Sequence, residues 1–146
     1  MIRIAVESDV NDMVLLLEQL FSIEEDFEFD QFRQKQGLEA LLASPSSVIL
    51  VKEQNNTVVA MVTGQLVIST AEGGAALLVE DVVVAPEYQK KGLGKKLLHA
   101  VGEWGKEKGA RRVQLLADKH NRPALDFYER VGFQKTNLQC FRKYNK

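Results

Sequence analysis

One segment, residues 82–98, constrains the fold of this chain more than any other, and it reads VVVAPEYQKKGLGKKLL. Its first three residues are valines, which suit a buried strand because β-branched side chains pack well on a pleated surface. Pro86 interrupts the strand, and apolar residues recur at helical spacing from Leu93 onward. The segment is therefore predicted to form a strand, a glycine-bearing loop and a helix.

The loop has the composition of an anion-binding site. Gly92 and Gly94 let backbone N–H groups approach a ligand closely. The first N–H groups of a helix lack intrahelical partners and carry the positive end of its dipole. Nearby lysines add positive charge at Lys90, Lys91, Lys95 and Lys96. Such a loop binds phosphates above all other anions.

Two common phosphate-binding motifs do not fit. A dinucleotide fingerprint, G-x-G-x-x-G, needs glycine or alanine where Leu97 stands. A P-loop that ends in Gly94-Lys95 needs glycine at position 89 and serine or threonine at position 96. The chain has Gln89 and Lys96 there. What remains is Q-x-x-G-x-G directly after a strand.

This pattern resembles the coenzyme A pyrophosphate loop of the GNAT superfamily of N-acetyltransferases. A second block, residues 121–133, resembles the N-x-x-A-x-x-F-Y-x-x-x-G-F signature of the same superfamily. In it, Asn121 is a good helix N-cap, Pro123 fits the first turn, and Gly132 ends the helix. The two blocks and their flanks cover the second half of the chain.

The bulk properties predict one domain over residues 1–146. A formal net charge of −1 gives no basic field for nucleic acid. No apolar run has the length of a signal peptide or a membrane span, so we expect a cytoplasmic protein with no membrane partner. Cys140 is the only cysteine, which excludes an internal disulfide. With two histidines, His99 and His120, we expect no metal site.

Periodicity and turn residues predict an α/β domain with a mixed sheet, in the order β-α-α-β-β-β-α-β-α-β-β. The predicted strands are residues 2–6, 47–52, 57–69, 75–84 and 111–118, with two short strands between Phe133 and Tyr144. The predicted helices are 8–21, 30–43, the helix that starts after the loop at 89–94, and 121–131. The resemblance implies that the sheet is splayed between its fourth and fifth strands and flanked by about four helices.

The resemblance also implies where coenzyme A binds. In the superfamily, the pantetheine arm of acetyl-coenzyme A fills the splay like an added strand and bonds unpaired backbone groups. A backbone N–H of this strand can also polarise the thioester carbonyl. Asn121 caps its helix, bonds the pantetheine, or does both. The expected cofactor-binding residues are Val82, Val83, Val84, Gln89, Lys90, Lys91, Gly92, Leu93, Gly94, Lys95 and Asn121.

Acetyl transfer to an amine requires a base that removes a proton from the amine and an acid that protonates the departing thiolate. Two residues are expected to fill these roles. The amine is mostly protonated at neutral pH, and Glu80 is the candidate base, on the same side of its strand as Val82 and Val84. Alternation places Asp81 on the other face. Tyr128 is the candidate acid, because a tyrosine phenol ordinarily titrates near about 10. Glu80 as a structural partner and Tyr128 as a core aromatic remain alternatives.

The expected function is N-acetyl transfer from acetyl-coenzyme A to a primary amine of a small molecule, peptide or protein. The acidic stretch Glu24, Glu25, Asp26, Glu28 and Asp30 is expected to attract a cationic acceptor, or else to be a solvated connector. The loop at residues 70–74 is a second candidate wall of the acceptor pocket. The alternative function is a non-catalytic coenzyme A-binding regulatory module. The sequence leaves open the acceptor, the pathway and a homodimer.

Overall fold

The computed structural model describes residues 1–23 and 27–145, which form two compact units, Met1–Leu116 and Ala117–Lys146. The first unit contains one sheet and three helices, and the second contains one helix. This element order confirms the predicted α/β class up to the last helix. Among the described residues, no helix combines the length and the apolar composition that crossing a membrane requires.

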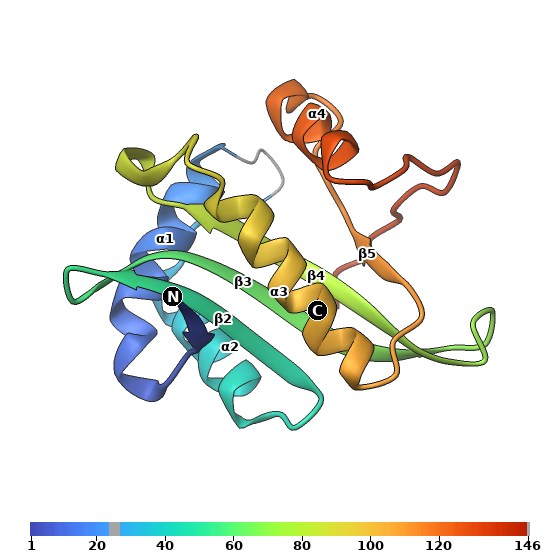
Figure 1. Cartoon of the computed structure of the whole chain (residues 1–146), viewed down its shortest axis with the longest axis horizontal. Helices are drawn as coiled ribbons and strands as arrows, with labels where there is room; N and C mark the ends of the chain where they lie inside the picture. Colours follow the sequence, from blue (N-terminus) through green and yellow to red (C-terminus); the bar gives the residue numbers. More distant parts are fainter. Residues whose placement is uncertain (24–26, 146) are drawn as a thin grey trace. The chain divides into compact units, whose positions relative to one another are not determined.

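One mixed sheet organises the first unit (Figure 1). Its strands are β1 (Ile2–Ile4), β2 (Ser47–Gln54), β3 (Thr57–Ser69), β4 (Gly74–Val84) and β5 (Val113–Leu115), and they lie in that order across the sheet. The pairs from β1 to β4 are antiparallel, whereas β5 is parallel to β4. The helices are α1 (Val10–Ile23), α2 (Gln31–Ala43) and α3 (Leu93–Glu107), with short 3₁₀ turns at Glu7–Asp9 and Pro86–Tyr88.

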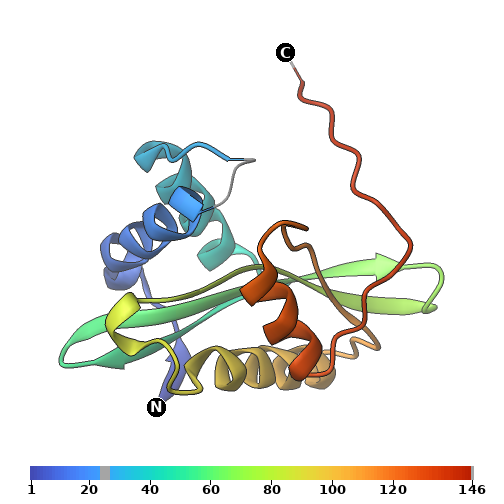
Figure 2. The same cartoon turned by 90° about the horizontal axis from the view of Figure 1, so that it is seen from above.

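Helices cover both faces of this sheet: α1 and α2 lie on one side and α3 lies on the other (Figure 2). The apolar stripe of α1 includes Met13 and Leu17, which join a buried cluster with Met61 of β3 and Val83 of β4. On the other face, Val101 of α3 packs near β3 and β4. Each helix therefore buries one apolar stripe on the sheet.

Local chemistry explains the element boundaries that the sequence predicted. Asp30 caps α2 by accepting hydrogen bonds from the amides of Phe32 (3.1 Å) and Arg33 (3.4 Å). Asn55 and Asn56 have φ values of 53° and 61°. This left-handed backbone suits the tight hairpin between β2 and β3.

Two predicted features of the C-terminal half differ in the structure. The fifth strand is shorter than the predicted 111–118 and spans Val113–Leu115. The two strands predicted between Phe133 and Tyr144 are wrong, because residues 133–145 form neither helix nor strand. Leu138 and Phe141 are exposed there. A strand exists only where a neighbour supplies ladder hydrogen bonds, and this tail has no such neighbour among the described residues.

Candidate active site

The middle of β4 carries a β-bulge. In the β3–β4 ladder, Val62 faces Val82 and Gly64 faces Val79. Two residues of β4, Glu80 and Asp81, therefore lie opposite the single residue Thr63 of β3. The extra residue changes which face of the sheet every later side chain of β4 reaches.

The bulge corrects the predicted parity of this strand. Val83, not Val82 or Val84, packs in the buried cluster beneath α1 and α2. Glu80 and Asp81 both line one groove on that same face, so Asp81 does not point to the opposite face. Simple alternation failed here because two consecutive residues share one ladder position.

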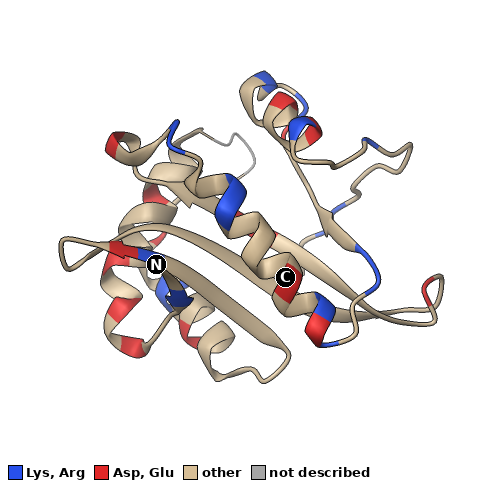
Figure 3. Ribbon diagram, viewed as in Figure 1, with Lys and Arg blue, Asp and Glu red and all other residues tan. Residues whose placement is uncertain are grey.

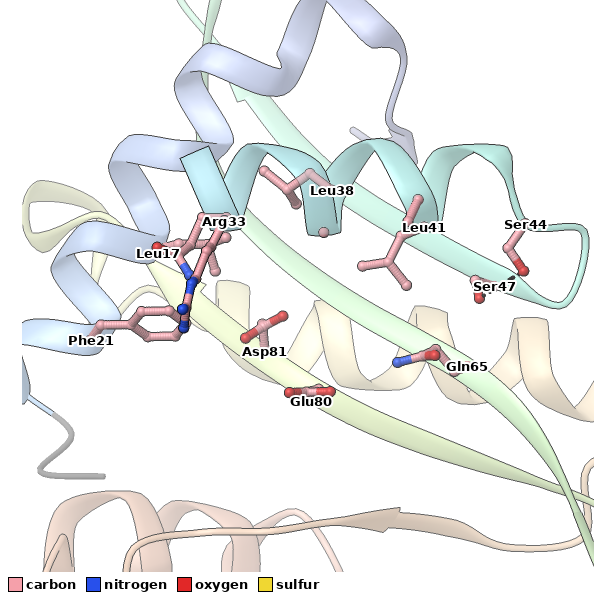
Figure 4. A pocket seen from close by; sticks show the side chains of 13 residues that line it. Leu17, Phe21, Arg33, Leu38, Leu41, Ser44, Ser47, Gln65, Glu80 and Asp81 are labelled. Atoms are coloured by element: carbon pink, nitrogen blue, oxygen red, sulfur yellow. Dashed lines mark hydrogen bonds between the residues drawn. The ribbon is translucent and has the colours of Figure 1, made fainter. Parts of the chain in front are cut away.

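The groove lies between α1, α2 and the middle of the sheet (Figure 4). Its apolar wall includes Leu17, Phe21 and Leu41, and its acidic part consists of Glu80 and Asp81. It has a volume of about 470 Å³, within the range of small-molecule pockets. The complete lining is Leu17, Phe21, Arg33, Gln34, Gly37, Leu38, Ala40, Leu41, Ser44, Ser47, Gln65, Glu80 and Asp81. This combination suits a ligand with a cationic group and an apolar part.

Asp81 has an unusual environment for a carboxylate. Burial raises its pKa to about 6, a hydrogen bond from Thr63 lowers the pKa in part, and the nearby charge of Glu80 raises it. The Thr63 hydroxyl lies 2.9 Å from Oδ2 of Asp81. Glu80 is exposed on the adjacent position. Alternation along β4 predicts only Glu80 on this face, because it assigns Asp81 to the opposite face.

Beyond the bulge, β4 has an open edge. The β4–β5 ladder ends at the pair Val79 and Leu115, whereas β4 continues to Val84. The amide of Ala85 donates to the carbonyl of Val59 (2.8 Å), so hydrogen-bonded pairs toward β3 fall at every second residue. Val82 and Val84 therefore direct their N–H and C=O groups away from β3. Val83 directs its N–H and C=O groups toward β3. Of the three valines expected to bind the pantetheine, only Val82 and Val84 therefore have backbone groups that face the open edge.

Two glutamine side chains already use the carbonyl of Val84. Nε2 of Gln19 on α1 and Nε2 of Gln89 each donate to this oxygen at 2.9 Å. The oxygen has two lone pairs, and both are engaged. What remains toward the open edge is the backbone of Val82 and the N–H of Val84. Gln89, predicted to contact coenzyme A, is thus also a structural link between the loop and β4.

The loop before α3 presents a row of amides. Lys90 and Gly92 have φ values of 63° and 81°, and α3 begins at Leu93. Within the part of the chain that the structure describes, the N–H groups of residues 90–95 have no hydrogen-bond acceptor. Alternating backbone handedness of this kind forms a concave anion site. Figure 3 shows lysines on this loop and on the first turns of α3.

The second unit holds the other two predicted site residues, on and before α4 (Arg122–Arg130). Asn121 caps α4: its Oδ1 accepts a hydrogen bond from the amide of Ala124 at 3.3 Å. The half-buried ring of Tyr128 contacts the rings of Phe127 and Phe133, with centroid distances of 5.4 and 5.9 Å. The capping role of Asn121 is therefore confirmed, and the aromatic neighbours fix the Tyr128 ring.

The predicted acidic stretch is accounted for only in part. Residues 24–26 lie outside the described residues. Asp30 acts as the cap of α2 and pairs with Arg33 at 3.6 Å. The second candidate wall, residues 70–74, contributes no residue to the groove lining described above. Instead, Glu72 forms an ion pair with Arg112 at 3.1 Å.

A sheet whose fourth and fifth strands separate, and a glycine-bearing loop at the start of a helix, are features that the superfamily resemblance implies. The model of the acetyltransferase (GNAT) family matches residues 14–133. The chain belongs to this family. The match includes β4, the loop, α3 and α4, so it extends from the first unit into the second.

Known relatives of this GNAT protein are N-acetyltransferases. The uncharacterized N-acetyltransferase YhfO of Bacillus subtilis is 30% identical over 98 residues, 67% of this chain and 66% of YhfO. The thialysine N-epsilon-acetyltransferase of Bos taurus is 33% identical over 73 residues, 47% of this chain and 43% of that protein. The matched segments therefore span less than two thirds of either relative's length.

Solved structures share the fold. An aminoglycoside N-acetyltransferase, AAC(6')-Iy, in complex with CoA superposes with a TM-score of 0.85 at 17% identity, over 100% of this chain and 95% of the other. At this identity the likeness concerns the fold alone. It confirms the predicted GNAT fold class.

Proposed function

We propose that this GNAT protein transfers the acetyl group of acetyl-coenzyme A to a primary amine. The observation that carries the proposal is the row of unpaired amides at residues 90–95, which immediately follows the open edge of β4. Phosphate groups suit the amides, and an extended arm with amide groups suits the edge. The aminoglycoside acetyltransferase of similar fold was solved with CoA, which agrees with this assignment.

In the proposed complex, the pyrophosphate lies on Gln89, Lys90, Lys91, Gly92, Leu93, Gly94 and Lys95. The pantetheine arm follows Val82 and Val84, while Val83 secures the strand in the core. Asn121 contributes to this site beside its capping role. The amide of Val82 faces the open edge of β4 and can donate to the thioester carbonyl, where negative charge develops during attack.

The acceptor is proposed to be a cationic amine with an apolar part. The carboxylates of Glu80 and Asp81 favour an ammonium group, and Leu17, Phe21 and Leu41 favour an alkyl or ring segment. Glu80 is the proposed base that removes a proton from the ammonium, directly or through water, because it is exposed within the groove. Tyr128 is the proposed acid for the departing thiolate.

The first experiment measures release of the coenzyme A thiol from acetyl-coenzyme A with a panel of amines. The panel contains n-butylamine, thialysine, an aminoglycoside and a peptide with a free N-terminus, and n-butanol serves as the uncharged control. We expect release that depends on at least one amine. Calorimetric binding of coenzyme A without amine-dependent release would instead support the non-catalytic binding module.

The matching test of the base is Glu80→Gln. Its activity should fall near pH 7 and recover in part at higher pH, where the amine loses its proton without help. The Michaelis constant for acetyl-coenzyme A should not change. Activity equal to that of the wild type at every pH would remove Glu80 from the mechanism.

A further inference from the structure

Thr63 is the only residue of β3 that lies opposite the bulge, and its side chain is almost fully buried, with 1% of the residue exposed. Its hydroxyl donates to Oδ2 of Asp81 at 2.9 Å and accepts a hydrogen bond from the amide of Asp81 at 3.0 Å. A hydroxyl has one proton and two lone pairs. Both the proton and one lone pair of the Thr63 hydroxyl therefore form hydrogen bonds with Asp81. Thr63 thus holds both the backbone and the carboxylate of Asp81.

The bulge determines the face of the sheet on which Asp81 lies. Without the extra residue in β4, alternation would place Asp81 on the face covered by α3 and Val82 on the face of the groove. The ladder register pairs neither Glu80 nor Asp81 with a residue of β3, and the Asp81 amide donates a hydrogen bond to the Thr63 hydroxyl.

We propose that Thr63 is a positioning residue for acetyl transfer: it holds the β4 bulge so that Asp81 and Glu80 face the acceptor groove together. This inference rests on the proposed function, since it concerns the same groove. Thr63 is buried beneath Asp81 and acts through that carboxylate rather than on the substrate.

The charges around Asp81 define what Thr63 controls. Glu80 of β4 and Arg33 of α2 are the charged residues that line the groove with Asp81. The lining from α1 and β3 is uncharged. Two adjacent carboxylates and one arginine leave a net negative site, which attracts an ammonium ion. If Asp81 turned away, Glu80 and Arg33 would neutralise each other.

The chemical step that this geometry serves is acetyl transfer to an amine that arrives as an ammonium ion. An acceptor R–NH₃⁺ loses one proton to the Glu80 carboxylate, which returns it to water. The nitrogen lone pair forms the new C–N bond at the thioester carbonyl and the C–S bond breaks. The acylated nitrogen then loses its second proton, and the departing thiolate takes up one proton. Asp81 stays ionised beside the ammonium group and stabilises its approach. Thr63 forms or breaks no covalent bond.

The experiment compares Thr63→Val with Thr63→Ser and with Thr57→Val, a matched control at the exposed start of the same strand. n-Butylamine is the probe if the wild type accepts it, and otherwise the best amine of the panel. Thr63→Val should raise the acceptor KM about tenfold, the size of one lost hydrogen bond to a charged group. The acceptor KM should change more than the KM for acetyl-coenzyme A, and Thr63→Ser should recover most of the wild-type value.

A pH profile separates positioning from mere packing. The Thr63 hydrogen bond lowers the pKa of Asp81, so its removal should shift the acid limb of kcat/KM toward higher pH in Thr63→Val. ¹³C NMR of the aspartate carboxyls, with Asp81→Asn for assignment, should show the same shift without any turnover. Thr63→Ser should restore the wild-type midpoint.

Each outcome decides the proposal. A folded Thr63→Val with the acceptor KM and pH profile of Thr57→Val overturns it. If Thr63→Val does not fold, Asp81→Asn takes its place, and an unchanged acceptor KM in that variant overturns the proposal equally. A wild type that transfers no acetyl group refutes the proposed function instead, while the NMR midpoint still tests whether Thr63 holds Asp81.

Discussion

At the residue scale, substitutions of two glycines distinguish a loss of coenzyme A binding from the effect of backbone strain. Gly92 and Gly109 flank α3 with φ values of 81° and 90°, and an added Cβ meets no atom within 4 Å at either position. Alanine at either site should therefore cost stability of about 1–2 kcal/mol through the left-handed backbone alone. Only Gly92→Ala should also disturb the amides at residues 90–95.

We expect Gly92→Ala to weaken coenzyme A binding about tenfold or more, because charge-assisted hydrogen bonds to phosphate depend on amide direction. Isothermal titration calorimetry measures the affinity, and a thermal melt measures the shared loss of stability. Gly109→Ala should bind coenzyme A like the wild type. Equal affinities in the two variants would place the phosphates elsewhere.

Tyr128 gives a second prediction at this scale. Tyr128→Phe keeps the ring that contacts Phe127 and Phe133 and removes only the hydroxyl. As the acid, Tyr128 should contribute about tenfold to a thousandfold to kcat, near the usual range for proton transfer. Rapid-quench measurement of the chemical step should show this loss, with the Kd of coenzyme A unchanged. An undiminished rate would make Tyr128 a packing residue.

At the scale of elements, α3 depends on a close approach to the sheet. A Cβ on Gly105 would lie 3.0 Å from Cδ2 and 3.3 Å from Cβ of Leu77, whereas a Cβ on Gly102 meets nothing within 4 Å. Gly105→Ala should therefore destabilise the protein by about 1–3 kcal/mol through overpacking. Gly102→Ala should stabilise it by about 0.5–1 kcal/mol, because alanine favours the helix. Urea denaturation measures both changes in the free energy of unfolding. Changes of the same sign in the two variants would contradict the close packing of Gly105 against Leu77.

The same elements show what local sequence chemistry can predict. The helix predicted at 30–43 and the strand predicted at 57–69 follow from local periodicity and β-branched runs, and both are confirmed. These features depend on neighbours along the chain. The loop at 89–94 was predictable for the same reason, since its glycines and lysines are contiguous.

Features that depend on distant residues were not predictable in this way. The bulge at Glu80 and Asp81 lies opposite Thr63, which is 18 residues before Asp81 in the chain. Alternation within β4 could not reveal it, so Asp81 was placed on the wrong face. The hydrogen bond from Gln19 of α1 to the Val84 carbonyl likewise joins residues that are distant in the sequence. The predicted strands after Phe133 failed because a strand needs partners that its own sequence does not contain.

At the scale of the whole molecule, two aspartates set opposite pH dependences of stability. Asp9 is buried and bound by the Arg3 guanidinium at 2.8 and 2.9 Å, and this hydrogen bonding lowers the pKa of its carboxyl. Asp81 has a pKa raised to about 6 by burial. In the unfolded chain, the carboxyl groups of both residues have a pKa of about 3.9.

Proton linkage determines whether each aspartate stabilises or destabilises the protein as the pH changes. A lowered folded pKa means that Asp9 stabilises the protein above about pH 4 and that this contribution is lost as the pH falls further. A raised folded pKa means that Asp81 destabilises the protein as the pH rises from about 4 through 6, because the folded state holds the proton longer. Above about pH 7 both contributions should be constant.

Urea denaturation of the wild type, Asp9→Asn and Asp81→Asn between pH 3 and pH 8 tests this expectation. Asp9→Asn should lose about 1–2 kcal/mol at pH 7, a value reduced by the partial exposure of Arg3, and the loss should shrink toward pH 3. Asp81→Asn should match the wild type near pH 4 and become increasingly more stable than it up to about pH 7. Such a gain would mean that the acidic groove is kept at the expense of stability, as expected of a residue retained for binding rather than for folding. A constant difference between Asp81→Asn and the wild type across this range would contradict the raised pKa, and with it the view that Asp81 is a buried carboxylate of the groove.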